Sequence, residues 1–432
     1  MIKIQITSVR GESNISRPER PIKLNQYPDL EPERAWELAN LIRIAGTDYQ
    51  CFNDWFNNKE GCKEFTLEED RKLKGIKSKN SWIYTEKKIN KTTLEEYTLL
   101  NEKESSDENV ANQFSDNDYY KYKIIKTYEY VSYCPINLDV DIDRFGFIAE
   151  RKEGDRKIIF IVFRGTREPT EWFSNAQFKQ VEFLKTEEDN PNGNKNPQGI
   201  EGYGKISLGF NKMYTNFRPG IFIEKIFLNR IFRSIDGRVR KLLKKIDDFD
   251  IEQKSIYKTI SEYFSSLNLD TNVDVYVTGH SLGGALATIA AMDIAEKDKL
   301  RTLINLYTFA SPRVGDNEFA DKFNQFTSGD NKKIKAFRFA NSEDIVPKVP
   351  FPVWFKSSIN LEQKPLLELA KDMFNKVTGG IFDKDYQHVG VPIYFTHQAL
   401  RFDENNRLVK PTATIGDNHN MTRTYCGALE EN

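Results

Sequence analysis

The feature that most constrains the fold of this chain is the segment VTGHSLGGAL at residues 277–286. The apolar run at 273–277 predicts a strand before it, and the pattern from Ala285 to Asp293 predicts a helix after it. A chain that passes so quickly from strand to helix brings the two elements into close contact. Glycines on both sides of Ser281 permit this, because they carry no Cβ atom that would clash. The segment therefore predicts a sharp turn with a serine hydroxyl at its tip.

Further short apolar runs alternate with helical patterns along the chain. They lie at 145–150, 158–163, 304–310, 334–340 and 391–395. Continuously apolar strands that alternate with helices indicate an α/β fold, with a mostly parallel central sheet covered by helices on both faces.

The first part of the chain has a different character. Residues 32–56 have helical spacing, whereas 66–125 is charged and rich in asparagine and is predicted to be a partly mobile surface excursion. We therefore expect an N-terminal segment over 1–125 and an α/β domain over 126–428.

Composition excludes several classes of protein. The 63 basic and 64 acidic residues nearly cancel, which argues against a nucleic-acid binder. Four cysteines without C-x-x-C spacing argue against a disulfide framework or a zinc site. The N-terminal sequence lacks the apolar region of a signal peptide, and apolar runs such as 158–163 are too short to span a bilayer. We expect a cytoplasmic protein.

Residues 279–283 fit the G-x-S-x-G pattern of the nucleophile elbow of an α/β-hydrolase. In such a turn Ser281 projects above the sheet, and the Leu282 N–H and the positive end of the helix point to where an oxyanion would form. A glycine-rich turn with an incidental serine is the alternative, but the strand before it and the helix after it favour a nucleophile.

A serine needs a general base, which in this fold follows it in the chain. The histidines after Ser281 are His388, His397 and His419. His280 adjoins the serine, but side chains that flank an elbow point elsewhere, so we expect a packed imidazole.

The base needs an orienting carboxylate, which should lie just past the end of a strand. Glu343 and Asp344 follow the strand expected at 334–340, and Asp316 follows the one at 304–310. Position alone leaves all three open; each could instead be a loop carboxylate that caps a helix.

Five motifs occur in order along residues 126–428, and together they resemble the class 3 or fungal-type lipases, a family that includes plant acyl hydrolases. The motifs are VFRGT at 162–166, GHSLGGA at 279–285, SPRVGD at 311–316, DIVP at 344–347 and YQHVG at 386–390. The resemblance implies an α/β-hydrolase fold.

The resemblance also implies roles for single residues. The family's triad aspartate directly precedes I-V-P, which selects Asp344, and its base lies near the C-terminus a few residues before an aromatic, which selects His419. The histidine of Y-x-H-V-G is usually structural, which demotes His388, and His397 matches no motif. The residue after F-R-G, here Thr166, is the family's first oxyanion donor.

Other parts of the family pattern concern substrate access. The family often carries a lid with a tryptophan after F-R-G, which implies a lid or substrate-binding role for Trp172 and Phe173, although an ordinary helix with inward aromatics is an equal alternative. Compared with the family pattern, the chain has insertions near 185–205, 219–250 and 351–385.

One basic segment could contact lipid. Residues 221–246 have an apolar stripe at helical spacing and eight Lys or Arg against two acids. This pattern is typical of a membrane-surface helix, but packing of the stripe on the sheet is the somewhat stronger expectation.

We therefore expect an enzyme: a carboxylic ester hydrolase of the lipase or phospholipase A type that cleaves glycerolipid esters through Ser281, His419 and Asp344 and an acyl-enzyme. No cofactor and no metal is expected, and no nucleic-acid partner. The expected partner is a lipid or ester substrate, with peripheral contact to a membrane or lipid-droplet surface. Hydrolysis of soluble esters or thioesters, and a non-enzymatic interaction module, are the alternatives; the intact triad argues against the latter.

Overall fold

A computed structural model describes the part of the chain from which the fold is built. The described residues are 24–56, 83–90, 93–100, 119–134, 139–166, 179–184, 199–215, 255–267, 273–297, 302–330, 332–350, 385–396, 401–402, 408–409 and 418–430. The basic segment 221–246 lies outside these ranges, as do most of the expected insertions near 185–205, 219–250 and 351–385.

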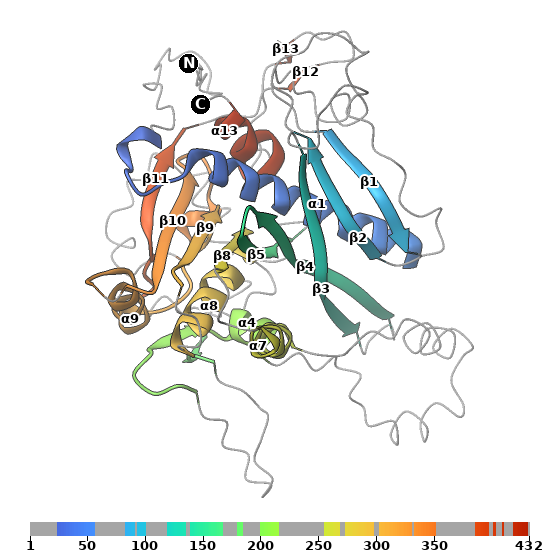
Figure 1. Ribbon diagram of the computed structural model, residues 1–432. Helices are drawn as coiled ribbons and strands as arrows, with labels where there is room; N and C mark the ends of the chain where they lie inside the picture. Colours follow the sequence, from blue (N-terminus) through green and yellow to red (C-terminus); the bar gives the residue numbers. More distant parts are fainter. Residues whose placement is uncertain are drawn as a thin grey trace, which may run out of the picture.

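A nine-stranded sheet forms the centre of the molecule, in the order β1-β2-β3-β4-β5-β8-β9-β10-β11 (Figure 1). Neighbours are antiparallel from β1 to β5 and parallel from β5 to β11. The antiparallel strands are β1 Ile83–Asn90, β2 Thr93–Leu100, β3 Tyr119–Cys134, β4 Asp139–Glu153 and β5 Arg156–Phe163.

The parallel strands that follow β5 are β8 Val273–His280, β9 Ile304–Phe309, β10 Ile334–Asn341 and β11 Val391–Phe395. Each coincides with an apolar run in the sequence, so the predicted strands are confirmed. The α/β-hydrolase class, with a parallel centre and helices on both faces, is also confirmed.

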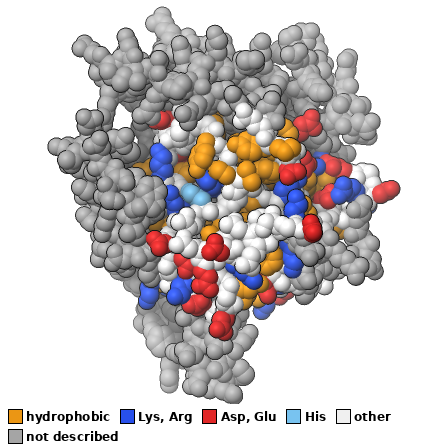
Figure 2. Space-filling model, turned by 90° about the vertical axis from the view of Figure 1, so that its left-hand side faces the viewer, with side chains coloured by type: hydrophobic (Ala, Val, Ile, Leu, Met, Phe, Trp, Pro, Cys, Tyr) orange, Lys and Arg blue, Asp and Glu red, His pale blue; other side chains and the backbone are white. Residues whose placement is uncertain are grey.

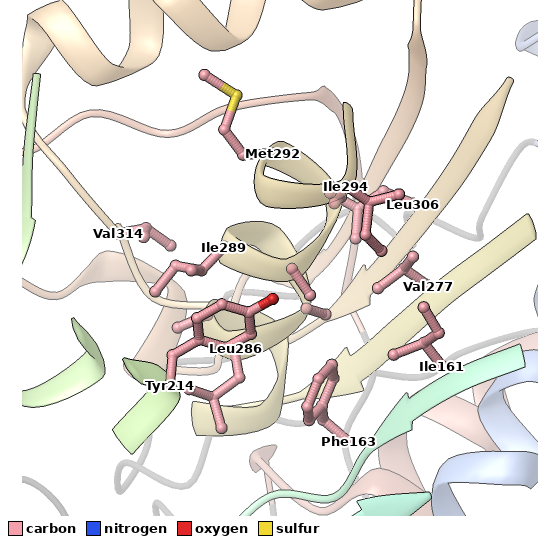
Figure 3. Close-up of a cluster of buried hydrophobic side chains, with 14 of the residues drawn as sticks. Ile161, Phe163, Tyr214, Val277, Leu286, Ile289, Met292, Ile294, Leu306 and Val314 are labelled. Carbon is pink, nitrogen blue, oxygen red and sulfur yellow. The ribbon is translucent and has the colours of Figure 1, made fainter. Parts of the chain in front are cut away.

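One face of the sheet is covered by α8, which follows the Ser281 turn. Helix α8, Leu282–Glu296, is buried at every position from Leu282 to Ala295, because it is apolar on all sides. Its Leu286 and Ile289 pack in the same apolar cluster as Phe163, Val277 and Leu306 of the strands (Figure 3). The other helices on this face are α4 Leu208–Thr215, α7 Ile256–Ser266 and α9 Asn317–Thr327.

The opposite face is covered by helix α1, Pro32–Phe56, and by the C-terminal turns (Figure 1). These turns are the π-helix η6 Met421–Cys426 and α13 Gly427–Glu430. Successive side chains of β5 point to opposite faces of the sheet. Phe163 packs in the same cluster as α8, and Phe160 packs in the same cluster as α1. Burial on both sides explains why the strands are continuously apolar.

The helix predicted over 32–56 is confirmed, and it packs on the sheet of the α/β domain. The charged stretch 66–125 differs from the prediction, because it contributes β1, β2 and the start of β3. Antiparallel pairing supplies the backbone hydrogen bonds of such strands whatever their side chains are. The charged composition of this stretch therefore did not indicate that it forms strands. The domain boundary expected after residue 125 falls inside β3 and stays a prediction.

Short elements complete the described structure. They are η1 Leu24–Gln26, β6 Gln180–Glu182, β7 Lys205–Ser207, η4 Val346–Lys348, β12 Arg401–Phe402 and β13 Leu408–Val409. Within the described ranges, no helix combines the length and the apolar character that crossing a membrane requires.

Candidate active site

Ser281 occupies the turn between β8 and α8 in a left-handed conformation, with φ 58° and ψ −125°. Such a backbone is strained for a residue with a side chain, and here its N–H donates to the Phe309 carbonyl at 2.9 Å. A Cβ atom on Gly283 would lie 2.3 Å from the Arg164 carbonyl oxygen, and one on Gly279 would lie 2.1 Å from the Gly283 oxygen. The glycines are therefore required, and the predicted sharp turn is confirmed.

Asp344 lies just after β10 and is fully buried. Its Oδ1 accepts a hydrogen bond from the Val346 N–H at 2.9 Å. Its Oδ2 accepts two more, from His419 Nδ1 at 2.7 Å and from the Tyr425 hydroxyl at 2.7 Å. These three donors fix the carboxylate, and they leave His419 with a proton on Nδ1 and a lone pair on Nε2.

Three buried polar atoms of the predicted site have no hydrogen-bond partner in the described structure: Ser281 Oγ, His419 Nε2 and Thr166 Oγ1. Buried polar groups are usually paired, so such atoms are unusual. Ser281 Oγ and His419 Nε2 do not bond each other here, a geometry that often tightens only when substrate binds.

His280 lies between these residues. A Cβ atom on Gly165, the neighbour of Thr166, would be 2.7 Å from His280 Nδ1 and 3.2 Å from Ser281 Cβ. His280 Nε2 donates to the His419 carbonyl at 2.9 Å, and the two imidazole rings lie 4.6 Å apart. His280 is thus packed, as expected, and it joins the Thr166 loop and the Ser281 turn to the segment that carries His419.

Electrostatics keep His280 neutral. Burial, and then the neighbouring His419, lower the pKa of His280 well below its ordinary value. A neutral His280 spares the site a second positive charge beside His419.

Tyr425 is the residue that the sequence analysis missed. It served there only as the aromatic that marks His419, yet its hydroxyl binds Asp344 and accepts from the Asn341 N–H at 3.2 Å. Burial, and then the Asp344 carboxylate, raise the pKa of Tyr425 well above its ordinary value, so the hydroxyl remains a donor.

The remaining candidates have other places in the structure. Asp316 caps helix α9 by accepting from the Phe319 N–H at 2.9 Å, and it also accepts from the Lys205 N–H at 3.0 Å. His388 Nε2 donates to the Pro347 carbonyl at 2.6 Å, and burial lowers its pKa well below the ordinary value. Of the candidate carboxylates, Asp344 and not Glu343 binds His419.

Arg164, in the VFRGT motif, supports the backbone beside the site. Its guanidinium donates to the carbonyls of Arg144 and Gly165 and lies over the Phe145 ring. The expected lid residues Trp172 and Phe173, and His397, lie outside the described residues. In the part of the chain that the structure covers, no three His, Cys, Asp or Glu side chains are grouped to hold a metal ion.

The parallel-centred sheet and the strained serine turn define an α/β-hydrolase fold. Residues 160–354 match the family described as Lipase (class 3).

Individual relatives are distant. The chain is 27% identical to phospholipase A1-Igamma1, chloroplastic, of Arabidopsis thaliana over 63% of this chain and 43% of the relative. It is 28% identical to triacylglycerol lipase OBL1 of Arabidopsis thaliana over 48% of this chain and 36% of the relative. A solved triacylglyceride lipase of Rhizomucor miehei is 23% identical, with a TM-score of 0.27, over 53% of this chain and 61% of that one. The chain thus spans less than half the length of these curated relatives.

Proposed function

We propose that this chain hydrolyses carboxylic esters of glycerolipids, with Ser281 as nucleophile, His419 as general base and Asp344 as its orienting carboxylate. The observation that carries the proposal is the buried His419–Asp344 pair at 2.7 Å, whose outer nitrogen is unpartnered while the hydroxyl of the strained Ser281 is unpartnered as well.

The reaction follows from the roles of these atoms. Ser281 Oγ attacks the ester carbonyl while His419 Nε2 takes its proton, and Asp344 stabilises the imidazolium through Nδ1–H. The Leu282 N–H, at the first position of α8, and Thr166 stabilise the oxyanion. His419 then protonates the leaving alcohol and later activates the water that cleaves the acyl-enzyme.

The names of the relatives support a lipid substrate. A phospholipase A1 and a triacylglycerol lipase are among the proteins that this chain resembles, and both names refer to lipid substrates. We therefore expect a glycerolipid rather than a soluble ester, at a lipid–water interface.

Labelling tests the nucleophile. A fluorophosphonate probe should modify the full chain at Ser281, and Ser281→Ala should abolish both labelling and ester hydrolysis. The control is Ser311→Ala, which changes a buried serine on the loop after the neighbouring strand β9 and should label normally. Undiminished turnover of Ser281→Ala would refute the mechanism.

A substrate panel tests the lipid class separately. Emulsified triacylglycerol, phosphatidylcholine vesicles and a monomeric short-chain ester should be compared with the same preparation. Faster turnover of either lipid than of the monomeric ester supports the proposal. Activity on the monomeric ester alone would mean that the protein is an esterase for soluble substrates.

A further inference from the structure

Arg338 is a buried cation with free donors. It lies on β10 and is 6% exposed, and its Nε and one terminal nitrogen, Nη1, have no hydrogen-bond partner among the described residues. Its other terminal nitrogen donates to the Tyr394 hydroxyl at 3.3 Å. Across the sheet its neighbours are Thr308 on β9 and Pro392 on β11, which carry no charge. Burying a charge without a counterion costs free energy, so an anion bound beside Arg338 would be stabilised.

A second arginine increases the positive charge. Arg313 donates to the carbonyls of Lys348 and Pro350, and no described carboxylate pairs with it or with Arg338. Burial, and then the charge of Arg338, lower the pKa of Arg313 to about 10. The same two arginines add to burial in lowering the pKa of His388. Two guanidinium charges, those of Arg313 and Arg338, therefore lie close together beside His388, and no carboxylate among the described residues compensates them.

Arg338 borders a pocket. The pocket is narrow and partly open to solvent, and it is lined by Arg338, His388, Ser311, Thr308 and Thr288 among others. The hydroxyls of Thr288 and Ser311 already donate to the carbonyls of Gly284 and Pro312, so the Arg338 guanidinium is the main donor of the lining. The lining includes no carboxylate. Figure 2 shows the corresponding side of the molecule, where a histidine reaches the surface next to basic side chains.

We propose that this pocket, the Arg338 pocket, binds one oxyanion, a phosphate or carboxylate group, with an oxygen inserted toward Arg338. The guanidinium fork suits such a group, because its parallel N–H donors match two oxygens. The pocket lies apart from the Ser281 hydroxyl, on the flank of α8 that bears Thr288, so the site is additional to the proposed ester hydrolysis.

Anion-dependent stability provides the test. Thermal unfolding of the full chain should be compared in sodium phosphate, sodium acetate and sodium chloride at equal ionic strength. Phosphate or acetate should raise the midpoint by about 2 °C more than chloride, since ligands that bind only the folded state stabilise it. Arg338→Met, which keeps the side-chain length but removes the charge, should lose this difference.

Two further variants make the result specific. Arg156→Met, at an exposed arginine that pairs with Asp274, should keep the full oxyanion effect. Arg338→Lys keeps the charge without the fork, and inorganic phosphate should bind it about tenfold more weakly in calorimetry. This second variant decides the matter if Arg338→Met does not fold.

Vesicles distinguish a free anion from a lipid headgroup. If Ser281→Ala protein binds phosphatidic acid vesicles more tightly than phosphatidylcholine vesicles, and Arg338→Met removes the difference, the anion is a headgroup. If only inorganic phosphate depends on Arg338, the anion is free. Equal midpoints in oxyanion and chloride for the parent protein, or an oxyanion effect that survives both Arg338 variants, would overturn the proposal and leave water as the occupant.

Discussion

Two buried carboxylates in this molecule have similar surroundings and differ in one respect. Glu37 on α1 accepts from the Tyr122 hydroxyl, as Asp344 accepts from Tyr425. Glu37 is also paired with Arg34 and with Arg151, the latter at 2.9 Å. The nitrogen that binds Asp344 belongs instead to an imidazole, that of His419.

This difference gives the two carboxylates different roles: Glu37 stabilises the fold, and Asp344 supports a side chain that can take part in chemistry. Guanidinium groups stay charged at any ordinary pH, so the Glu37 cluster can only fasten α1 to β3 and β4. An imidazole held by one nitrogen presents the other, and the free Nε2 of His419 can accept a proton. Substitutions in the two clusters should therefore have opposite consequences for activity and stability.

The largest effect is expected for His419→Ala. Loss of the base should lower kcat for a chromogenic ester about 10⁴-fold while the unfolding free energy changes little. His388→Ala is the matched control, because His388 binds the Pro347 carbonyl, and it should reduce stability and not kcat. The reverse pattern in two folded proteins would assign the base to His388.

Glu37→Gln should do the opposite. Removal of the charge leaves Arg34 and Arg151 with only the more exposed Glu153 as a described carboxylate partner, so the unfolding free energy should fall by about 1 to 3 kcal/mol in urea titrations. Turnover of the folded protein at low temperature should stay within about twofold, because the cluster touches no residue of the candidate site. A loss of kcat as large as that of His419→Ala would end the distinction between the clusters.

Tyr425→Phe should have a smaller effect. It removes one hydrogen bond to a charged group, which corresponds to about a tenfold loss in kcat with KM unchanged. Tyr122→Phe removes the equivalent bond to Glu37 and should alter stability only. An equal effect of both variants on kcat would show that Tyr425 supports the fold and does not position Asp344.

The smallest effect concerns pH. Because the pKa of His280 is depressed in the folded state, the unfolded chain binds a proton more readily below the ordinary value of 6.5. Its contribution to stability is complete above that pH and declines as pH falls toward the depressed value. His280→Gln should therefore lose less stability than the parent protein between neutral and mildly acidic pH, by about 1 kcal/mol in urea unfolding. If the unfolding free energies of the parent protein and of His280→Gln changed equally with pH, His280 would not be buried in its neutral form.

Much of the fold could be predicted because its signals are local. Apolar runs of strand length predicted β5 and β8 to β11, and glycines around Ser281 predicted the turn, since a missing Cβ decides whether strand and helix can approach. The helix over 32–56 was visible from its spacing. The strands β1 and β2 were not, because charged residues hide the alternation and pairing with β3 supplies what the sequence pattern lacks.

The amino-acid sequence by itself determined the serine turn, the order of the strands along the chain and a short list of carboxylates and histidines. The family resemblance implied Asp344 and His419 among them, and only the tertiary structure shows that these two meet. Asp344 and His419 are 75 positions apart, and Tyr425 reaches Asp344 across 81. Likewise, nothing local distinguishes Arg338, with its free donors, from Arg151, which Glu37 compensates. The pairing of a buried charge depends on which strands and loops fold against it, and that is a property of long-range contacts rather than of residue type.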